Sequence, residues 1–355
     1  MKQGRQLDFT GQNIFVGMDV HKKSWKISIR SEQMELRTFS QSPSVKILSD
    51  HLKQNYPLAN YHVVYEAGFC GFGYQRKFAE EGINCIIVHP ADVPTSDKDK
   101  QRKSDTVDCR KLGQTLSKGQ LTGIYIPSIG QQDDRGVIRV YQQMVKDQTR
   151  FKNRIKSWLA FQGIDIPGDD EHKYWSNNFV RWLKNISLTP SARIHLDILI
   201  QGYEQARAMV LTATRQVRAL SQQTRYRGMI KLIRSVPGIG EITALLIITE
   251  IGDIHRFKTL DNLCDYIGFV PRVHGSGEKE TTLGLTHRGH HALREKFIEA
   301  SWTAVRLDPA MTLAFNTYCK RMKKNRAIIK IAKKLLNRVR YVLKNKKAYV
   351  PAVVK

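Results

Sequence analysis

The sequence contains no uninterrupted apolar run of about 18 residues, which is the length that a membrane-spanning helix needs, and no signal-peptide pattern at its N-terminus. Its five cysteines are odd in number, widely scattered and without a Cys-x-x-Cys pair, a distribution that does not suit a disulfide framework. These absences predict a cytoplasmic protein with reduced, structural cysteines and no membrane partner.

Acidic residues are scarce relative to basic ones. The 355 residues include 32 Asp and Glu against 58 Lys and Arg, a formal net charge of +26. Cations that neutralise phosphates release condensed counterions, so this excess favours a nucleic-acid partner. Hydrophobic residues make up 41% and charged residues 25% of the chain, which excludes a wholly disordered protein, and the length suggests two or three domains.

The N-terminal part, residues 1–128, alternates short apolar runs with helical patterns. Residues 14–18 are apolar on both faces, as in a buried central strand. Further strands are expected at 25–30, 34–39, 61–65 and 84–88, and helices at 44–54 and 74–81. Strands that come first, followed by alternating helix and strand, predict a mixed α/β domain.

The middle of the chain, residues 129–227, has almost no strand pattern. Apolar residues recur at helical spacing on both sides of a break at 163–170 and a turn at Pro190. This pattern predicts long amphipathic helices that form an antiparallel coiled-coil pair. Such a segment favours self-association, and we expect a dimer or a tetramer.

The third part, residues 228–355, is expected to be mainly helical. It opens with a Pro237–Gly240 corner between two apolar helices, an arrangement that resembles a helix-hairpin-helix element. In that interpretation the backbone at Gly238 and Gly240 contacts a phosphate. A tight corner between two helices without a ligand is the alternative.

The last 36 residues, from Lys320 to Lys355, include 14 Lys or Arg and no acid. Apolar residues interleave with these cations, so part of this basic tail is expected to be an amphipathic helix. A solvated charge run is the usual explanation of such a stretch, but the complete lack of acids favours a nucleic-acid face. Candidate phosphate contacts are Lys323, Lys324, Lys333 and Lys334.

Four carboxylates are placed where they could converge. Asp19 and Glu66 each end a buried strand, a costly position unless the acid is paired or used. If Ser104 caps a helix, Asp105 and Asp108 project from one face of its first turn. Any one of these acids alone is more often solvated or capping. Together they suit two Mg²⁺ (or Mn²⁺) ions that clamp a phosphodiester during displacement.

The segments 17–22, 65–68 and 103–110 resemble the DEDD transposases of insertion sequences, which are relatives of the Piv DNA invertases. The resemblance implies a RuvC-like N-terminal domain with an RNase H fold, in which the same four acids form the metal-binding tetrad. The third segment belongs to a stretch, residues 97–110, that carries five Lys or Arg, and Lys103 and Arg110 are its candidate nucleic-acid contacts.

The resemblance continues through a C-terminal transposase domain, in the segments 237–240, 268–272, 276–277 and 286–294. It implies that Ser276 is a nucleophile that forms a covalent phosphoserine link to one DNA strand. In the last segment, His287 and His290 stand where the family has Lys and Asn.

Ser276 lies between Gly275 and Gly277, where a bulky phosphate can approach closely. Without the resemblance, a turn residue would be the better interpretation. A serine hydroxyl needs activation, and because the segment offers no obvious base, the metals of the tetrad are the expected activators. The close histidines 287, 290 and 291 could bind zinc, but phosphate or base contact is favoured. Candidate contacts in this region are Arg272, Gly275, Gly277, His287, Arg288 and Arg294.

The family resemblance implies donor and target DNA as substrates. It also implies guidance by a structured non-coding RNA, called a bridge or seeker RNA, that pairs with both DNAs. One alternative is a structure-selective endonuclease such as a Holliday-junction resolvase, which would use the tetrad without a covalent intermediate. The other is a non-catalytic nucleic-acid-binding protein, which would be expected to have lost at least one of the four acids.

Overall fold

The computed structural model describes residues 8–94, 104–168, 175–276 and 279–351, with only the backbone described between 272 and 283. The chain folds as two compact units, Met1–Ile126 and Pro127–Lys355. The first unit is mixed α/β and the second is mostly helical. The three-part domain division remains a prediction.

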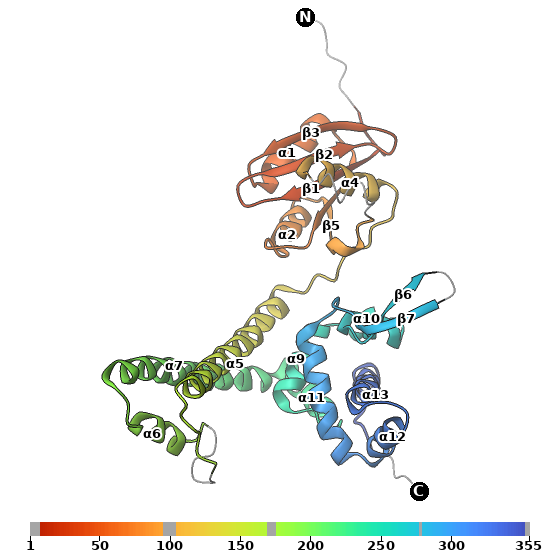
Figure 1. Ribbon diagram of the computed structural model, residues 1–355. Helices are drawn as coiled ribbons and strands as arrows, with labels where there is room; N and C mark the ends of the chain where they lie inside the picture. The colour runs from red at the N-terminus through yellow and green to blue at the C-terminus, as the bar shows by residue number, and fades with distance from the viewer. Residues whose placement is uncertain (1–7, 95–103, 169–174, 277–278, 352–355) are drawn as a thin grey trace, which may run out of the picture. The chain divides into compact units, whose positions relative to one another are not determined.

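The N-terminal unit is built on a five-stranded sheet with the strand order β3-β2-β1-β4-β5 (Figure 1). β1 pairs antiparallel with β2, and β2 with β3, whereas β1 pairs parallel with β4, and β4 with β5. All the predicted strands are present: β1 (Asn13–Val20), β2 (Trp25–Arg30), β3 (Glu35–Gln41), β4 (Asn60–Glu66) and β5 (Asn84–Val88). The mixed α/β architecture is therefore confirmed.

Helices cover both faces of this sheet: α1 (Val45–Asn55), α2 (Gly73–Glu80) and α4 (Asp105–Ser117), with a 3-10 turn at Pro90–Asp92. Side chains alternate across a strand, and β4 shows the result. Val63 and Tyr65 pack in the core that includes residues of α1 and α2. Val64 packs with Leu112 of α4 in a separate cluster.

β1 and α4 approach each other unusually closely at two glycines. A Cβ atom on Gly17 would lie 2.0 Å from the carbonyl oxygen of Cys109 and 2.3 Å from the backbone nitrogen of Gly113. Both neighbours are backbone atoms of the helix, so no rotamer change could make room. The absence of a side chain at Gly17 therefore sets how close α4 lies to the sheet.

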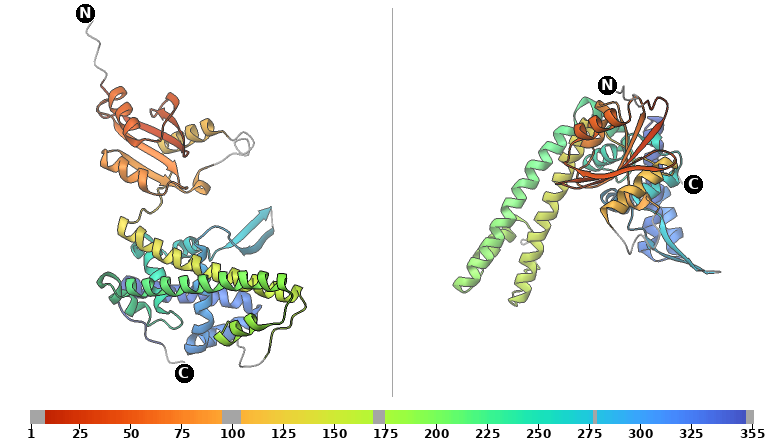
Figure 2. Two further views of the ribbon diagram at one scale, coloured as in Figure 1. Left: turned by 90° about the vertical axis from the view of Figure 1, so that its left-hand side faces the viewer. Right: turned by 90° about the horizontal axis from the view of Figure 1, so that it is seen from above.

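The C-terminal unit consists of helices and one β-hairpin. Its elements are α5 (Ile129–Phe161), α6 (Asn177–Asn185), α7 (Pro190–Ser221), α8 (Thr224–Ile233), α9 (Glu241–Ile251), a 3-10 turn (Ile254–Arg256), α10 (Leu260–Ile267), β6 (Pro271–Ser276), β7 (Lys279–Leu285), α11 (His291–Leu307), α12 (Pro309–Cys319) and α13 (Lys324–Asn345). The two long helices α5 and α7 run side by side, as the predicted antiparallel pair should (Figure 2). Over the described residues, no helix is both long and apolar enough to cross a lipid bilayer.

Much of the basic C-terminal stretch forms a helix that packs in the core. The expectation of an amphipathic helix is confirmed over Lys324–Asn345. Apolar residues at helical spacing, including Ile331, Leu335 and Val339, are fully buried in the main core of the unit. The cations occupy the remaining face, so this segment contributes both packing and positive charge.

One buried acid joins three parts of the C-terminal unit. Glu250 of α9 is 1% exposed, and Arg139 of α5 donates to both of its carboxylate oxygens over 2.9 and 3.0 Å. His290, directly before α11, lies 3.1 Å from the same carboxylate. Burial, the largest influence, would raise the pKa of Glu250, but the bonds from His290 and Arg139 together lower it to about 2. The buried charge is thus fully paired.

We predict that Gly17→Ala forces α4 away from the sheet and destabilises the protein. The added methyl group would overlap backbone atoms, and the fully buried Cys109 and Leu112 on α4 would lose packing. We expect a loss of about 1–3 kcal/mol or more in the free energy of unfolding, measured by urea denaturation. Gly73→Ala is the matched control, because its Cβ would meet nothing within 4 Å. Equal stability of the two variants would contradict this account of the packing.

Candidate active site

Asp19 and Glu66 lie side by side because their strands are parallel neighbours. Met18 of β1 is in register with Tyr65 of β4, so the next residue of each strand is an acid at the same edge of the sheet. Alternation along β1 places Asp19 on the face of Gly17, which is the face that α4 covers. The two acids that sequence reasoning placed at strand ends therefore lie at one edge.

The helix that carries the second pair of acids begins as predicted. The hydroxyl oxygen of Ser104 accepts a hydrogen bond from the backbone N–H of Val107, which fixes the start of α4. Asp105 and Asp108 are then three residues apart in the first turn. The close contact at Gly17 brings this end of the helix to the sheet edge.

All four predicted acids line one pocket of about 460 Å³. Its wall is formed by the end of β1, the residues that follow β4, and the first turns of α4. The pocket lies within the N-terminal unit. Three chain segments that are far apart in the sequence thus contribute carboxylates to one cavity.

His21 also lines this pocket, although sequence reasoning assigned it no role. Its Nε2 atom lies 3.2 Å from an oxygen of Asp19 and 3.4 Å from an oxygen of Asp105. One ligand atom from each of the three residues falls within 4.8 Å of the others, so together they could hold a metal ion. The only available signal was its position two residues after Asp19, beyond the last residue of the strand.

The electrostatics of the pocket favour a cation. The side chain of Asp19 is 23% exposed, and burial raises the pKa of this carboxyl group above its ordinary value. Contact with His21 opposes the shift, while the charges of Asp105 and Asp108 add to it. A divalent cation would relieve this repulsion. Carboxylate oxygens suit Mg²⁺ or Mn²⁺, and an added imidazole nitrogen suits softer divalent ions as well.

Of the two basic residues predicted to contact nucleic acid beside the acids, the structure describes one. Arg110, on α4, forms an ion pair with Glu35 of β3 over 3.0 Å and remains half exposed. Lys103 lies outside the described residues. A nucleic-acid contact at either residue remains a prediction.

Ser276 is the last residue of β6, at the end of a two-stranded hairpin. Its backbone is in register with Lys279 of β7, and that of Gly275 with Glu280. Arg272 lies on the same strand. The side chains of this segment and the whole of Gly277 lie outside the described residues. The predicted Ser-Gly segment thus begins at the last residue of β6.

Arg294 closes the base of this hairpin. Its guanidinium donates to the carbonyl oxygen of Gly268 over 3.2 Å and to that of Thr286 over 2.6 Å. These two residues flank the hairpin on either side. Gly268 has a φ of +86°, and a Cβ there would lie 2.7 Å from the carbonyl oxygen of Arg288. Arg294 therefore has a structural contact, and its predicted nucleic-acid contact remains untested.

Two of the three neighbouring histidines, His290 and His291, contact other protein groups through their side chains. His290 Nδ1 accepts a hydrogen bond from the backbone N–H of Leu293, which caps α11 as an asparagine would. His291 contacts the carbonyl oxygen of His287 through Nε2 and the guanidinium of Arg294 through Nδ1. Within the described part of the chain, these histidines belong to no group that could hold a metal.

The two glycines of the Pro237–Gly240 corner differ in their surroundings. Gly238 has a φ of +87°, and a Cβ on it would lie 2.2 Å from the carbonyl oxygen of Ala300 on α11. Gly240 precedes α9, and its Cβ would meet nothing within 4 Å. The corner is therefore packed against α11 on one side and open on the other.

The four lysines predicted on the C-terminal stretch lie at the start of α13 and along it. Lys323, Lys324 and Lys334 are exposed, and Lys333 is half-buried. They belong to the face of α13 that does not enter the core. This face is available for phosphate contacts, which remain a prediction.

Two family models match the chain in order. A model for DEDD transposases of the IS110 group, described as a transposase, matches residues 16–162. A model described as the transposase IS116/IS110/IS902 family matches residues 230–316. The first match includes the four acids and the second includes Ser276.

Curated relatives give the same result. The transposase for insertion sequence element IS1111A of Coxiella burnetii is 26% identical over 246 residues, 69% of this chain and 66% of the relative. The transposase for insertion sequence element IS1533 of Leptospira borgpetersenii is 25% identical over 259 residues, 71% and 72% of the two chains. The pilin gene-inverting protein of Moraxella bovis is 33% identical over 113 residues, 30% of this chain and 34% of the relative.

The chain spans 57 to 72% of the length of the first three curated relatives it matches. Both family models describe transposases. The first covers most of the N-terminal unit and α5, and the second covers a later part of the C-terminal unit. The chain therefore belongs to the IS110/IS116/IS902 family of insertion-sequence transposases.

Proposed function

We propose that this protein is an insertion-sequence transposase that cleaves and exchanges DNA strands at a divalent-metal site formed by Asp19, Glu66, Asp105 and Asp108. The observation that carries the proposal is the single pocket that all four acids line. Membership of the transposase family supports the same reaction. A non-catalytic binding protein would have no need to keep four acids together in one cavity.

The N-terminal unit is proposed to have the RuvC-like form of the RNase H fold. The strand order β3-β2-β1-β4-β5, with three antiparallel strands followed by two parallel ones, supports this assignment. We further propose a catalytic domain over residues 1–128, a helical domain over 129–227 and a transposase domain over 228–355.

The donor set fits Mg²⁺ or Mn²⁺, and we propose two ions in each site. When bound, such ions offset negative charge on the attacking and leaving oxygens of a phosphodiester. Asp19 and Asp105 would supply oxygen ligands from the sheet edge and from the helix. His21, within 3.4 Å of both, would orient the two carboxylates or add a nitrogen ligand.

Ser276 is proposed as the nucleophile. Its Oγ atom would form a bond to the phosphorus of a DNA strand while the bond from phosphorus to one deoxyribose oxygen breaks. The hydroxyl proton leaves the serine, and the released deoxyribose oxygen takes up a proton. The position of Ser276 at the end of β6, in register with Lys279 of β7, supports this role, as does the family match across this segment.

The proposed partners are donor DNA, target DNA, a structured guide RNA and further copies of this chain. The net charge of +26 supports binding to nucleic acids. Exposed apolar residues on α7 support a dimer or a tetramer: Ile194 and Ile198 are each 62% exposed and Met209 is 55% exposed.

The tetrad is tested by isosteric substitution. Asp19→Asn, Glu66→Gln, Asp105→Asn and Asp108→Asn each remove a charged oxygen ligand but keep the shape of the side chain. We expect each to lose DNA cleavage in Mg²⁺ and to weaken Mn²⁺ binding, measured by calorimetry, by more than the roughly 10–100-fold that loss of an outer-shell partner costs.

The matched control is Asp50→Asn on α1, an exposed acid that pairs with Lys46 and lies outside the pocket. It should bind Mn²⁺ and cleave DNA like the wild type. Normal cleavage and normal Mn²⁺ binding in any two of the tetrad variants would exclude the proposed metal site.

The nucleophile is tested by Ser276→Ala and Ser276→Cys. We expect Ser276→Ala to abolish strand exchange, because a methyl group cannot attack phosphorus, and Ser276→Cys to keep at most a trace. Wild-type protein should form a denaturation-resistant DNA adduct, which mass spectrometry would locate on the peptide that contains Ser276. A structure-selective endonuclease would give no adduct, and its alanine variant would cleave at a nearly normal rate.

A further inference from the structure

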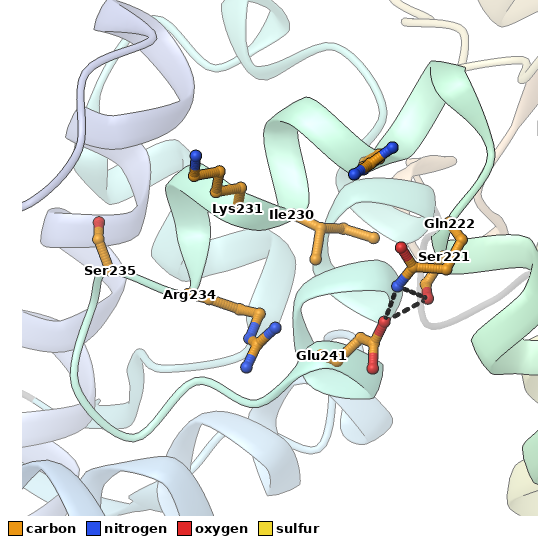
Figure 3. A pocket seen from close by; sticks show the side chains of 8 residues that line it. Ser221, Gln222, Ile230, Lys231, Arg234, Ser235 and Glu241 are labelled. Atoms are coloured by element: carbon orange, nitrogen blue, oxygen red, sulfur yellow. Dashed lines mark hydrogen bonds between the residues drawn. The ribbon is translucent and has the colours of Figure 1, made fainter.

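The C-terminal unit contains a second polar pocket, of about 420 Å³, beside the Pro237–Gly240 corner. It lies among the end of α7, the length of α8 and the first residue of α9 (Figure 3). Ser221 and Ile230 are its buried residues, 1% and 4% exposed. No aromatic ring occurs among the residues that line it.

Three cations line this pocket: Arg227, Lys231 and Arg234. They lie four and three residues apart on α8 and its C-terminal end, a spacing that places them along one face. All three are exposed. Within the described part of the chain, none of them makes an ion pair, so their charge is available to a ligand.

Glu241 is the one acid in the lining, and it is bound to neutral groups. One of its carboxylate oxygens accepts hydrogen bonds from the hydroxyl of Ser221 over 2.6 Å and from the amide of Gln222 over 2.5 Å (Figure 3). These bonds fix the carboxylate at the α7 side of the pocket. Three cations against one acid leave a net positive cavity.

The C-terminal segment is anchored at the rim of the same pocket. The hydroxyl oxygen of Ser235 accepts a hydrogen bond from the backbone N–H of Tyr349 over 2.7 Å. The Tyr349 hydroxyl in turn donates to Asp308 over 3.0 Å and accepts from Arg338 over 2.8 Å. The two exposed lysines at 346 and 347 immediately precede this anchor, so further positive charge lies nearby in the chain.

We propose that this pocket binds phosphate groups of a nucleic-acid backbone, as a site separate from the metal-binding acids. Unpaired cations suit phosphate oxygens, whereas the lack of aromatic rings in the lining does not suit base stacking. The inference rests on the proposed function in that it assumes a nucleic-acid substrate. It adds a site on α8 that contributes affinity without reading sequence.

The test measures binding in EDTA, where no cleavage can occur. The variant Arg227→Gln/Lys231→Gln/Arg234→Gln removes three cations from the pocket. Its control, Lys146→Gln/Arg181→Gln/Arg215→Gln, removes three exposed cations from α5, α6 and α7 of the same unit. The probes are a random-sequence DNA duplex and a hairpin RNA of matched length, followed by fluorescence anisotropy over a series of salt concentrations.

For a duplex, each lost phosphate contact reduces the magnitude of the slope of log affinity against log salt by about 0.9. Because three cations are removed, the slope of the pocket variant should be smaller in magnitude by about 2.7. The control should keep a slope close to that of the wild type. A smaller slope with only one of the two probes would identify that nucleic acid as the ligand. Equal slopes for wild type, pocket variant and control with both probes would overturn the proposal.

Glu241→Gln provides a test of opposite sign. The amide oxygen of the new glutamine can still accept from Ser221, while the negative charge that repels phosphate is gone. This variant should therefore bind nucleic acid more tightly and with a steeper dependence of affinity on salt. Weaker or unchanged binding would count against a phosphate in the pocket. These assays involve neither metal nor cleavage. A negative result in them would not count against the proposals for the tetrad and Ser276. Equally, a negative result for the tetrad or Ser276 would not count against phosphate binding in this pocket.

Discussion

The geometry of the candidate active site depends on one backbone contact, the approach of α4 to β1 at Gly17. A side chain there would overlap the carbonyl of Cys109 and the nitrogen of Gly113. With no side chain, the helix lies directly on the strand, and its first turn reaches the sheet edge where Asp19 and Glu66 lie. The acids are exposed enough to bind a ligand, but the contact that brings them together is fully buried.

The C-terminal unit uses its positive charge in three distinct ways. Arg139 neutralises the buried Glu250, so the charge of Arg139 is paired within the fold. Arg294 binds two carbonyl oxygens at the base of the β6–β7 hairpin and thereby fixes the ends of the segment that carries Ser276. The cations on the outer face of α13 and in the α8 pocket remain for a polyanion. Net charge alone does not distinguish these uses.

Sequence reasoning predicted the features that follow from local rules. Strand ends, the Ser104 cap and the shared face of Asp105 and Asp108 all follow from hydrophobic spacing and capping chemistry. It missed His21 and gave Arg294 only a nucleic-acid role, because their partners are distant in sequence or are backbone carbonyls. It also predicted an amphipathic helix in the C-terminal stretch from the apolar residues that interleave with its 14 cations, and these apolar residues pack in the core.

Crystals grown with Mn²⁺ would show whether the four acids hold divalent metal. Anomalous scattering would locate the ions without reference to activity. We expect Mn²⁺ in the pocket at the end of β1, with oxygens of Asp19, Glu66, Asp105 and Asp108 among its ligands at about 2.1 Å. A pocket without Mn²⁺ at saturating concentration, or ions bound elsewhere with these carboxylates unligated, would contradict it.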